Sequence, residues 1–234
     1  MKFENKVAII TGSTRGIGRA TAELFAKEGA KVIVVGTKEE LGESCVNEIK
    51  AAGGEAIFCK TDVTSDESLD NLVKTALDAY GKIDILVNNA GVGGTTANMD
   101  QITMDEWNTV LATNLTAPFV LCKKLIPIME KQGAGTIVNV ASMAATAAGR
   151  GGLAYTSAKH GLSWTHPSDV IGSWTYRSAY KCCSSRTDCN RYDCTCACNS
   201  TASGNNEDWN ESGKTSWRTY RSSTGYCIPC IRRS

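Results

Sequence analysis

The sequence has almost no excess of charge of either sign. Its 234 residues include 25 Lys and Arg against 24 Asp and Glu, a net charge of +1. Nucleic acids and acidic membranes attract strongly basic proteins, so the charge predicts affinity for neither. Long apolar runs are also missing, since no segment approaches the ~18 consecutive apolar residues that cross a membrane. Residues 1–6 lack the apolar stretch of a signal peptide, so we expect a cytoplasmic protein.

Cysteine is scarce in the first 162 residues, where only Cys45, Cys59 and Cys122 occur. The rest of the 11 cysteines lie further on, at positions 182, 183, 189, 194, 196, 198, 227 and 230. Such dense cysteine is unusual in a cytosolic α/β enzyme. The shift in composition predicts a boundary between residues 1–162 and a Cys-rich tail, residues 163–234.

The segment Tyr155-Thr156-Ser157-Ala158-Lys159 carries the first sign of chemistry. Tyr155 and Lys159 stand four residues apart, a spacing that puts both side chains on one face of a helix. A phenol has an ordinary pKa of about 10, and a neighbouring ammonium group favours the phenolate. A tyrosine held in this way can give or take a proton at an alcohol or carbonyl oxygen. Tyr-x-x-x-Lys is a weak motif alone, so its meaning depends on what precedes it.

A glycine-rich turn lies between a predicted buried strand, residues 6–10, and a predicted helix, residues 19–29. Its residues are Thr11-Gly12-Ser13-Thr14-Arg15-Gly16-Ile17-Gly18. Glycines permit a tight turn and a close approach of backbone to phosphate. The first turn of the helix presents free N–H groups to such an anion. In this context the turn predicts a dinucleotide site, with a purely structural turn as the alternative.

The predicted second strand, residues 31–36, has no acidic residue at its end. An acid there binds the ribose hydroxyls of NAD, whereas a basic residue tolerates the phosphate of NADP. Thr37 and Lys38 follow the strand, and Arg15 adds a second positive charge. The pattern favours NADP(H) over NAD(H), with Lys38 as an ordinary solvated lysine being the alternative.

Three more apolar runs have polar residues at their ends. Residues 55–59 end at Asp62 and Val63, residues 83–87 run into Asn88-Asn89-Ala90-Gly91, and residues 135–140 end at Ser142. Five strands alternating with helices predict an α/β fold, a Rossmann-like, doubly wound parallel sheet in the order 3-2-1-4-5. Ligands bind at the carboxyl ends of such strands.

Three asparagines occupy positions where their side chains can have a specific role. Asn88 and Asn89, at the end of a strand, can bond backbone on both sides and leave room for a flat ligand. Asn114 lies inside a long predicted helix, residues 104–130, where asparagine is mildly unfavourable. A specific role for Asn114 is therefore expected.

Residues 1 to about 162 resemble the short-chain dehydrogenase/reductase family. The matching motifs are, in order, Thr11-Gly12-x-x-x-Gly16-Ile17-Gly18, Asp62-Val63, Asn88-Asn89-Ala90-Gly91, Asn114, Ser142 and Tyr155-x-x-x-Lys159. The resemblance implies an oxidoreductase that transfers a hydride between NAD(P)(H) and a small alcohol or carbonyl substrate. It also implies a homodimer or homotetramer.

The resemblance also implies roles for individual residues. Tyr155 is the acid/base, and Ser142 steadies the substrate oxygen. Lys159 favours the phenolate and binds the nicotinamide ribose, while Asn114 holds a water of the proton relay. The cofactor residues implied are Gly12, Ser13, Thr14, Arg15, Gly16, Ile17, Gly18, Thr37, Lys38, Asp62, Val63, Asn89, Ala90, Gly91, Tyr155 and Lys159.

The tail departs from the family, which continues into a sixth strand, a Pro-Gly turn, a substrate helix and a seventh strand. Pro167 breaks the helix soon after Lys159, and the polar residues 199–223 show no strand pattern, so we expect a disordered tail. Read one base out of frame with favourable codons, residues 174–187 can encode G-P-I-G-V-R-I-N-A-V-V-P-G. This string is similar to the missing strand and turn. We infer a frameshift near Leu162-Ser163, in the gene or in the sequence record.

A metal or disulfide module is the rival interpretation of the tail. Cys194-x-Cys196-x-Cys198 and Cys227-x-x-Cys230 have ligand-like spacings. The two clusters lie far apart in a region without a core, and a frameshift explains the cysteines without a function, so no metal site is predicted. Three functions stay open: an NADP(H)-linked oxidoreductase, a non-catalytic remnant that binds nucleotide, and a Cys-rich module fused to a Rossmann half-domain.

Overall fold

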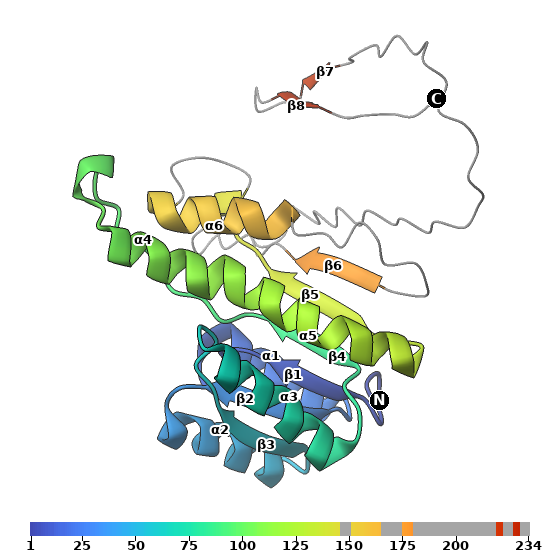
Figure 1. The fold of residues 1–234 in the computed structure, drawn as a ribbon. Coiled ribbons are helices and arrows are strands. Elements are labelled where there is room, and N and C mark those ends of the chain that lie inside the picture. The colour runs from blue at the N-terminus through green and yellow to red at the C-terminus, as the bar shows by residue number, and fades with distance from the viewer. Residues whose placement is uncertain (146–150, 165–174, 180–218, 222–226, 230–234) are drawn as a thin grey trace. The chain divides into compact units, whose positions relative to one another are not determined.

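The computed structural model describes residues 1–145, 151–164, 175–179, 219–221 and 227–229 (Figure 1). The chain divides into two compact units, Met1–Asp193 and Cys194–Ser234. The first unit contains the parallel sheet and the helices that cover it. Among its described residues the second contains a strand pair, β7 (Thr219–Arg221) antiparallel to β8 (Cys227–Pro229).

The sheet has the predicted topology. Its strands are β1 (Val7–Ile10), β2 (Lys31–Gly36), β3 (Glu55–Lys60), β4 (Ile85–Asn88), β5 (Thr136–Val140) and β6 (Thr175–Ala179). They pair in the order β3-β2-β1-β4-β5-β6, and every pairing is parallel (Figure 1). The expected order 3-2-1-4-5 is therefore confirmed for the first five strands, and the fold is the Rossmann-like α/β class.

The helices follow the strands in alternation. They are α1 (Gly16–Lys27), α2 (Glu39–Ala51), α3 (Asp66–Tyr80), α4 (Met104–Leu111), α5 (Ala117–Gln132) and α6 (Leu153–Trp164), with short 3-10 turns η1 (Met99–Gln101) and η3 (Met143–Ala145). Local chemistry sets several ends. Ser65 caps α3 by accepting the Ser68 N–H, and Gly81 and Gly133 end α3 and α5 in the left-handed conformation that glycine adopts freely.

Two apolar layers cover the two faces of the sheet. On one face, Leu72 of α3 and Leu125 of α5 pack against Ile9 and Ile33. On the other face, Ala22 of α1 and Val46 of α2 pack against Ile10 of β1 and Val34 of β2. Because successive strand side chains point to opposite faces, the continuous apolar runs in β1 and β2 supply both layers.

The predicted single helix over residues 104–130 is interrupted. A π-helical turn, η2 (Ala112–Thr116), joins α4 to α5, and Asn114 lies in it, fully buried. Such turns are frequent at functional sites. The prediction missed the turn because helical periodicity in the sequence continues through it.

One helical stretch among the described residues, Met104–Gln132, is long and apolar enough to cross a membrane by length and composition. Polar and charged residues interrupt this stretch, so the expectation that no run of ~18 consecutive apolar residues occurs is not contradicted. Leu121, Leu125 and Met129 of this stretch are buried against the sheet. A core helix meets the same criterion, because apolar residues that face a core raise its mean hydropathy.

Strands β6, β7 and β8 lie in the tail, where the sequence indicated none. β6 pairs with the open edge of β5, with Tyr176 opposite Ile137 and Arg177 opposite Val138. An edge offers unpaired backbone N–H and C=O groups, which almost any segment can match. The prediction required an apolar pattern that this pairing does not need. The other tail residues for which disorder was expected, including most of 199–223, lie outside the described residues.

Candidate nucleotide-binding and catalytic site

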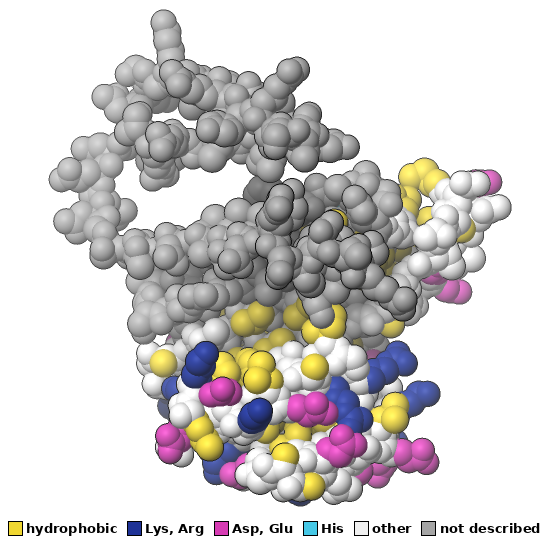
Figure 2. Space-filling view, turned by 180° about the vertical axis from the view of Figure 1, so that it is seen from behind, with side chains coloured by type: hydrophobic (Ala, Val, Ile, Leu, Met, Phe, Trp, Pro, Cys, Tyr) yellow, Lys and Arg dark blue, Asp and Glu magenta, His cyan; other side chains and the backbone are white. Residues whose placement is uncertain are grey.

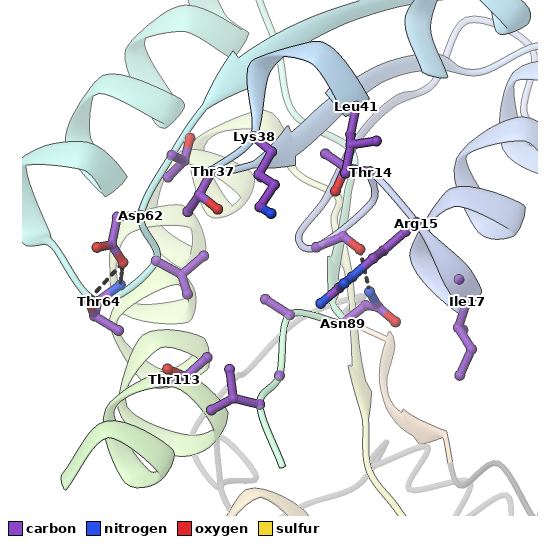
Figure 3. Close-up of a pocket in the computed structure, with 18 residues that line it drawn as sticks. Thr14, Arg15, Ile17, Thr37, Lys38, Leu41, Asp62, Thr64, Asn89 and Thr113 are labelled. Atoms are coloured by element: carbon purple, nitrogen blue, oxygen red, sulfur yellow. Dashed lines mark hydrogen bonds between the residues drawn. The ribbon is translucent and has the colours of Figure 1, made fainter. Parts of the chain in front are cut away.

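A cavity of about 510 Å³ lies where β1, β2, β3 and β4 end (Figure 3). Its lining residues are Gly12, Thr14, Arg15, Gly16, Ile17, Gly36, Thr37, Lys38, Leu41, Thr61, Asp62, Val63, Thr64, Asn89, Ala90, Gly91, Val92 and Thr113. Most of the residues assigned to the cofactor by resemblance are among them. Ser13 and Gly18 lie outside the lining, as do Asn114, Ser142, Tyr155 and Lys159.

The glycine-rich turn brings α1 close to the end of β4. Gly12 has φ +63°, and a Cβ placed on it would lie 2.8 Å from the Ala90 Cα. A Cβ on Gly18 would collide with the Gly12 carbonyl and with Asn89. Arg15, the N-cap of α1, forms no side-chain cap. The first N–H groups of α1 therefore remain available to an anion such as a pyrophosphate.

Ser13 has a structural place beneath the turn. It is fully buried, and its hydroxyl donates to the Ile10 carbonyl at 2.6 Å and accepts the Val35 N–H at 2.8 Å. These bonds tie β1 to β2. The Ser13 side chain thus anchors the turn to the two strands, whereas Thr14 and Arg15 line the cavity.

Thr11 organises the end of β4, a role that the sequence analysis did not assign to it. Its Oγ1 accepts the N–H groups of Asn89 and Ala90, both at 2.9 Å, and donates to the Val87 carbonyl at 3.3 Å. A hydroxyl residue at a strand end, just before a glycine turn, is the signal that could have identified it. Thr11 fixes the backbone that forms one wall of the cavity.

Only one of the two asparagines behaves as expected. The Asn89 amide donates to the carbonyls of Thr11 and Gly12 at 2.9 and 3.1 Å, so it does bond backbone. The Asn88 amide instead donates to the Asn139 side chain on β5 at 2.8 Å. Asn88 is buried, bonds across to β5, and is not among the residues that line the cavity.

Arg15 and Lys38 supply positive charge from two different elements. Both residues are exposed, and Figure 3 shows their side chains reaching into the space between α1, β2 and β4. In the part of the chain that the structure describes, neither takes part in an ion pair. Elsewhere basic and acidic side chains are interspersed, as the face in Figure 2 shows. The two cations are thus available to an anionic ligand.

Asp62 lies across the cavity from Arg15 and is held by Thr64. The Thr64 N–H and hydroxyl both donate to Asp62 Oδ1, at 2.9 and 2.7 Å (Figure 3). These two hydrogen bonds lower the pKa of the Asp62 carboxyl. Thr61 and Thr64 also line the cavity, and the sequence analysis missed both because threonine carries no distinctive spacing signal.

Helix α6 carries Tyr155 and Lys159 on one face, as their spacing predicts. The Lys159 Nζ lies 5.8 Å from the centroid of the Tyr155 ring and donates to the Val140 carbonyl at 2.8 Å. Lys159 is only 4% exposed, and this burial lowers its pKa to about 8. The lysine therefore connects α6 to the end of β5 and places a cation beside the phenol.

Ser142 and Asn114 approach this region from two other elements. Ser142 follows β5 by two residues, is half-buried, and its Oγ accepts the Ala144 N–H at 3.2 Å. Asn114 donates to the carbonyls of Val92 and Val110, both at 2.9 Å, and accepts the Val92 N–H at 3.2 Å. Its amide thus holds the loop after β4.

The cysteines of the rival metal interpretation fall largely outside the described residues. Cys194, Cys196, Cys198 and Cys230 are not among those residues. Within the described part of the chain, His, Cys, Asp and Glu side chains form no group that could hold a metal ion. Cys45, Cys59 and Cys122 are free thiols.

Comparison with known proteins follows the same division of the chain. The family described as short chain dehydrogenase matches residues 6–166. A 3beta-hydroxysteroid dehydrogenase of Mediterraneibacter gnavus is 38% identical over 162 residues, covering 69% of this chain and 58% of that protein. A 7alpha-hydroxysteroid dehydrogenase of Clostridium sardiniense is 40% identical over 166 residues, covering 69% of this chain and 63% of that protein.

A solved structure gives the same result. A metagenomic short-chain oxidoreductase, crystallised in complex with NADP, superimposes with a TM-score of 0.67 at 35% identity, covering 70% of this chain and 74% of that one. The chain spans about three-fifths of the length of the curated relatives that it matches. The similarity ends close to the residue where the composition changes.

Proposed function

The chain belongs to the short-chain dehydrogenase family, and from that premise we propose that it is an NADP(H)-dependent oxidoreductase acting on an alcohol/carbonyl pair. Residues 1–162 would form its nucleotide-binding and catalytic domain. The two relatives named above are hydroxysteroid dehydrogenases, which makes ring-bound secondary alcohols the first substrates to test. We also propose that residues 163–234 arise from a frameshift near Leu162-Ser163.

The cavity has the features that a dinucleotide needs. The glycine turn and the free N–H groups of α1 would hold the pyrophosphate. Asp62 and the backbone of Asn89, Ala90 and Gly91 would border the adenosine. Arg15 and Lys38, both without an acidic partner in the described structure, would bind the phosphate that distinguishes NADP from NAD.

Tyr155 would handle the proton of the reaction. Bound NADP(H) supplies or accepts the hydride at the substrate carbon. In the oxidation direction the Tyr155 phenolate takes the hydroxyl proton as the hydride leaves the same carbon, and in the reduction direction the phenol returns it. Ser142 would donate to the substrate oxygen, and the Lys159 ammonium would stabilise the phenolate.

The observation that carries this proposal is the placement of Lys159. The Lys159 Nζ lies 2.8 Å from the Val140 carbonyl and 5.8 Å from the centroid of the Tyr155 ring. Burial alone lowers the pKa of Lys159, and no carboxylate contributes to the shift. Burying an ammonium without an acidic partner is costly. Such a cost is typical of functional sites, where perturbed groups gather.

The test is the substitution Tyr155→Phe, made in a chain whose reading frame is restored near the codon for Ser163. We expect turnover to fall by on the order of a hundredfold or more, because acid/base groups contribute about that much. The Kd for NADPH, measured by fluorescence titration, should stay nearly unchanged. Tyr80→Phe is the matched control, since the Tyr80 hydroxyl is buried without a partner and lies outside the cavity. Retained turnover in Tyr155→Phe would exclude the assignment.

A second candidate is a remnant that binds nucleotide without turnover. The specific observation that favours it is coverage, because the chain matches only 58% of the length of its relative from Mediterraneibacter gnavus. NADPH titration together with a turnover assay over the alcohol panel separates the two. Binding without turnover in both the parent chain and a chain with its reading frame restored near Ser163 supports the remnant, and turnover in either chain supports the enzyme.

A further inference from the structure

The loop after β4 is held at two points by one helical stretch. Asn114 of η2 holds Val92 through two hydrogen bonds: its amide donates to the Val92 carbonyl and accepts the Val92 N–H. About two turns earlier, Glu106 of α4 holds Thr95: its Oε1 accepts the Thr95 N–H at 2.6 Å and the Thr95 hydroxyl at 2.9 Å. The Asn114 contact lies next to the nucleotide cavity, which Val92 lines. The Glu106 contact lies beyond that cavity.

Thr95 in turn contacts the start of the helix that bears Tyr155. A Cβ on Gly152 would collide with the Thr95 carbonyl, so the loop backbone lies directly on Gly152. A Cβ on Gly94 would lie 3.8 Å from the Tyr155 backbone nitrogen. The Gly152 carbonyl accepts the Thr156 N–H at 2.9 Å, the first hydrogen bond of α6. Movement of Thr95 would therefore disturb the first turn of α6.

Helix α4 packs against α6 independently of the loop. Val110 of α4 and Ala154 and Ala158 of α6 form a small buried cluster, with Trp107 and Tyr155 against it. Glu106 is thus attached to the same helix that supports Tyr155 from the side. The loop, held by Glu106, supports the beginning of α6 as well.

We propose that Glu106 is a positioning residue for Tyr155: through Thr95 it holds the loop of residues 92–95 against Gly152 and so keeps the first turn of α6 in place. The inference rests on the proposed function for its catalytic meaning, whereas the mechanical link can be measured without turnover. The proposal predicts that the start of α6 and the nucleotide cavity respond differently to a change at Glu106. Loss of the Glu106 carboxylate loosens the start of α6 but leaves the nucleotide cavity intact.

The first test is amide hydrogen exchange on the full-length chain. In Glu106→Ala, exchange at both Thr95 and Thr156 should accelerate by about tenfold, because local opening governs exchange of such amides. Glu106→Gln should restore most of the protection, since its Oε1 still accepts the Thr95 N–H. Asp105→Ala is the control: Asp105 shares the first turn of α4 and its dipole interaction, whereas the carboxylate that accepts the Thr95 N–H and hydroxyl is that of Glu106.

Faster exchange at Thr95 with unchanged exchange at Thr156 would overturn the proposal, because the contact would then be local only. Equal effects of Glu106→Ala and Asp105→Ala would overturn it as well, since helix-end charge alone would explain them. If Glu106→Ala fails to fold, Thr95→Val replaces it. That variant loses the hydroxyl bond and keeps the N–H bond, so a smaller acceleration at Thr156 is expected, and none would contradict the link.

The second test uses kinetics. In Glu106→Ala, kcat should fall by about tenfold while the Kd for NADPH stays within about twofold, because misplacement of a reacting group lowers rate far more than nucleotide affinity. Equal losses in kcat and in NADPH affinity would overturn the proposal that Glu106 acts on the start of α6 alone. If neither the parent chain nor a chain with its reading frame restored near Ser163 turns over substrate, the proposed function fails by itself, and the exchange experiment still decides the role of Glu106.

Discussion

Strands β1 and β6 have the same parallel geometry but opposite kinds of sequence. β1 reads Val-Ala-Ile-Ile, and all four residues are buried. β6 reads Thr-Tyr-Arg-Ser-Ala, with polar residues at most positions. A parallel strand covered on both faces needs a continuous apolar run, which β1 has and β6 lacks. The comparison shows that a strand's place in a sheet can come from its neighbour's open edge, without a pattern of its own.

The same contrast divides the whole chain. Up to α6, motifs, topology and relatives agree, and the cavity and the Tyr155 helix are formed. Beyond α6, the similarity stops at residue 166. One reading frame is expected to specify a fold consistently at every level, so a sudden loss of consistency supports the proposed frameshift. The predictions below test each side of this division.

The largest effect is expected from restoring the reading frame near the codon for Ser163. The restored chain should unfold in one cooperative transition and show NADPH-dependent turnover at least about a hundredfold higher, since a misplacement of about 1 Å already costs about that much. A gene with silently recoded codons over the same stretch is the control for expression. Equal melting cooperativity and equal turnover in both chains would refute the frameshift.

On the nucleotide-binding side, Gly18→Ala should act strongly. The added Cβ has no space beside the Gly12 carbonyl and Asn89, so we expect a loss of about 1–3 kcal/mol in unfolding free energy, measured in urea. NADPH affinity should fall as well, because α1 must move away from the turn. Gly93→Ala serves as the matched variant, since an added Cβ there meets nothing within 4 Å. Similar losses in both variants would contradict the close packing of α1.

Removing the two cations Arg15 and Lys38 should have a smaller effect than Gly18→Ala, and the effect should be specific to NADP(H). The double variant Arg15→Ala/Lys38→Ala should weaken NADPH binding by about tenfold or more, which is about 1.4 kcal/mol. NADH binding should change little, because NADH lacks the phosphate. Lys27→Ala, at the far end of α1 and outside the cavity, provides the control. Comparable or tighter binding of NADH than of NADPH by the parent chain, measured by fluorescence titration, would refute the assignment.

Lys159 should give the smallest effect, a dependence of stability on pH. Its folded pKa of about 8 lies below the ordinary value of 10.5, so the unfolded chain binds more protons between these values. Stability should therefore rise with pH across this window, by on the order of 1 kcal/mol between about pH 8 and 9.5. The contribution should vanish in Lys159→Met, measured by urea unfolding at each pH. A slope that persists in that variant would assign the effect to other groups.

Local signals predicted the fold well and the site in part. Apolar runs identified the first five strands, and the glycine turn located the cavity, because backbone freedom at Gly12 is a local property. Side-chain direction was harder to predict. The resemblance assigned Ser13 to the cofactor, and Asn88 was expected to bond backbone. In the structure the Ser13 hydroxyl joins β1 to β2, and the Asn88 side chain joins β4 to β5. A strand-end residue can face either side, and only the neighbouring strand decides which.

The sequence by itself determined the succession of strands and helices, the turn before α1 and the spacing of Tyr155 and Lys159, because periodicity and glycine conformation depend on nearby residues. Only the tertiary structure decided which distant groups meet. It brings Lys159 to the Val140 carbonyl, Asn114 to Val92 and Glu106 to Thr95. It also pairs β6 with β5 despite its polar sequence. Such contacts depend on how packed elements orient their side chains and edges, which no local pattern encodes.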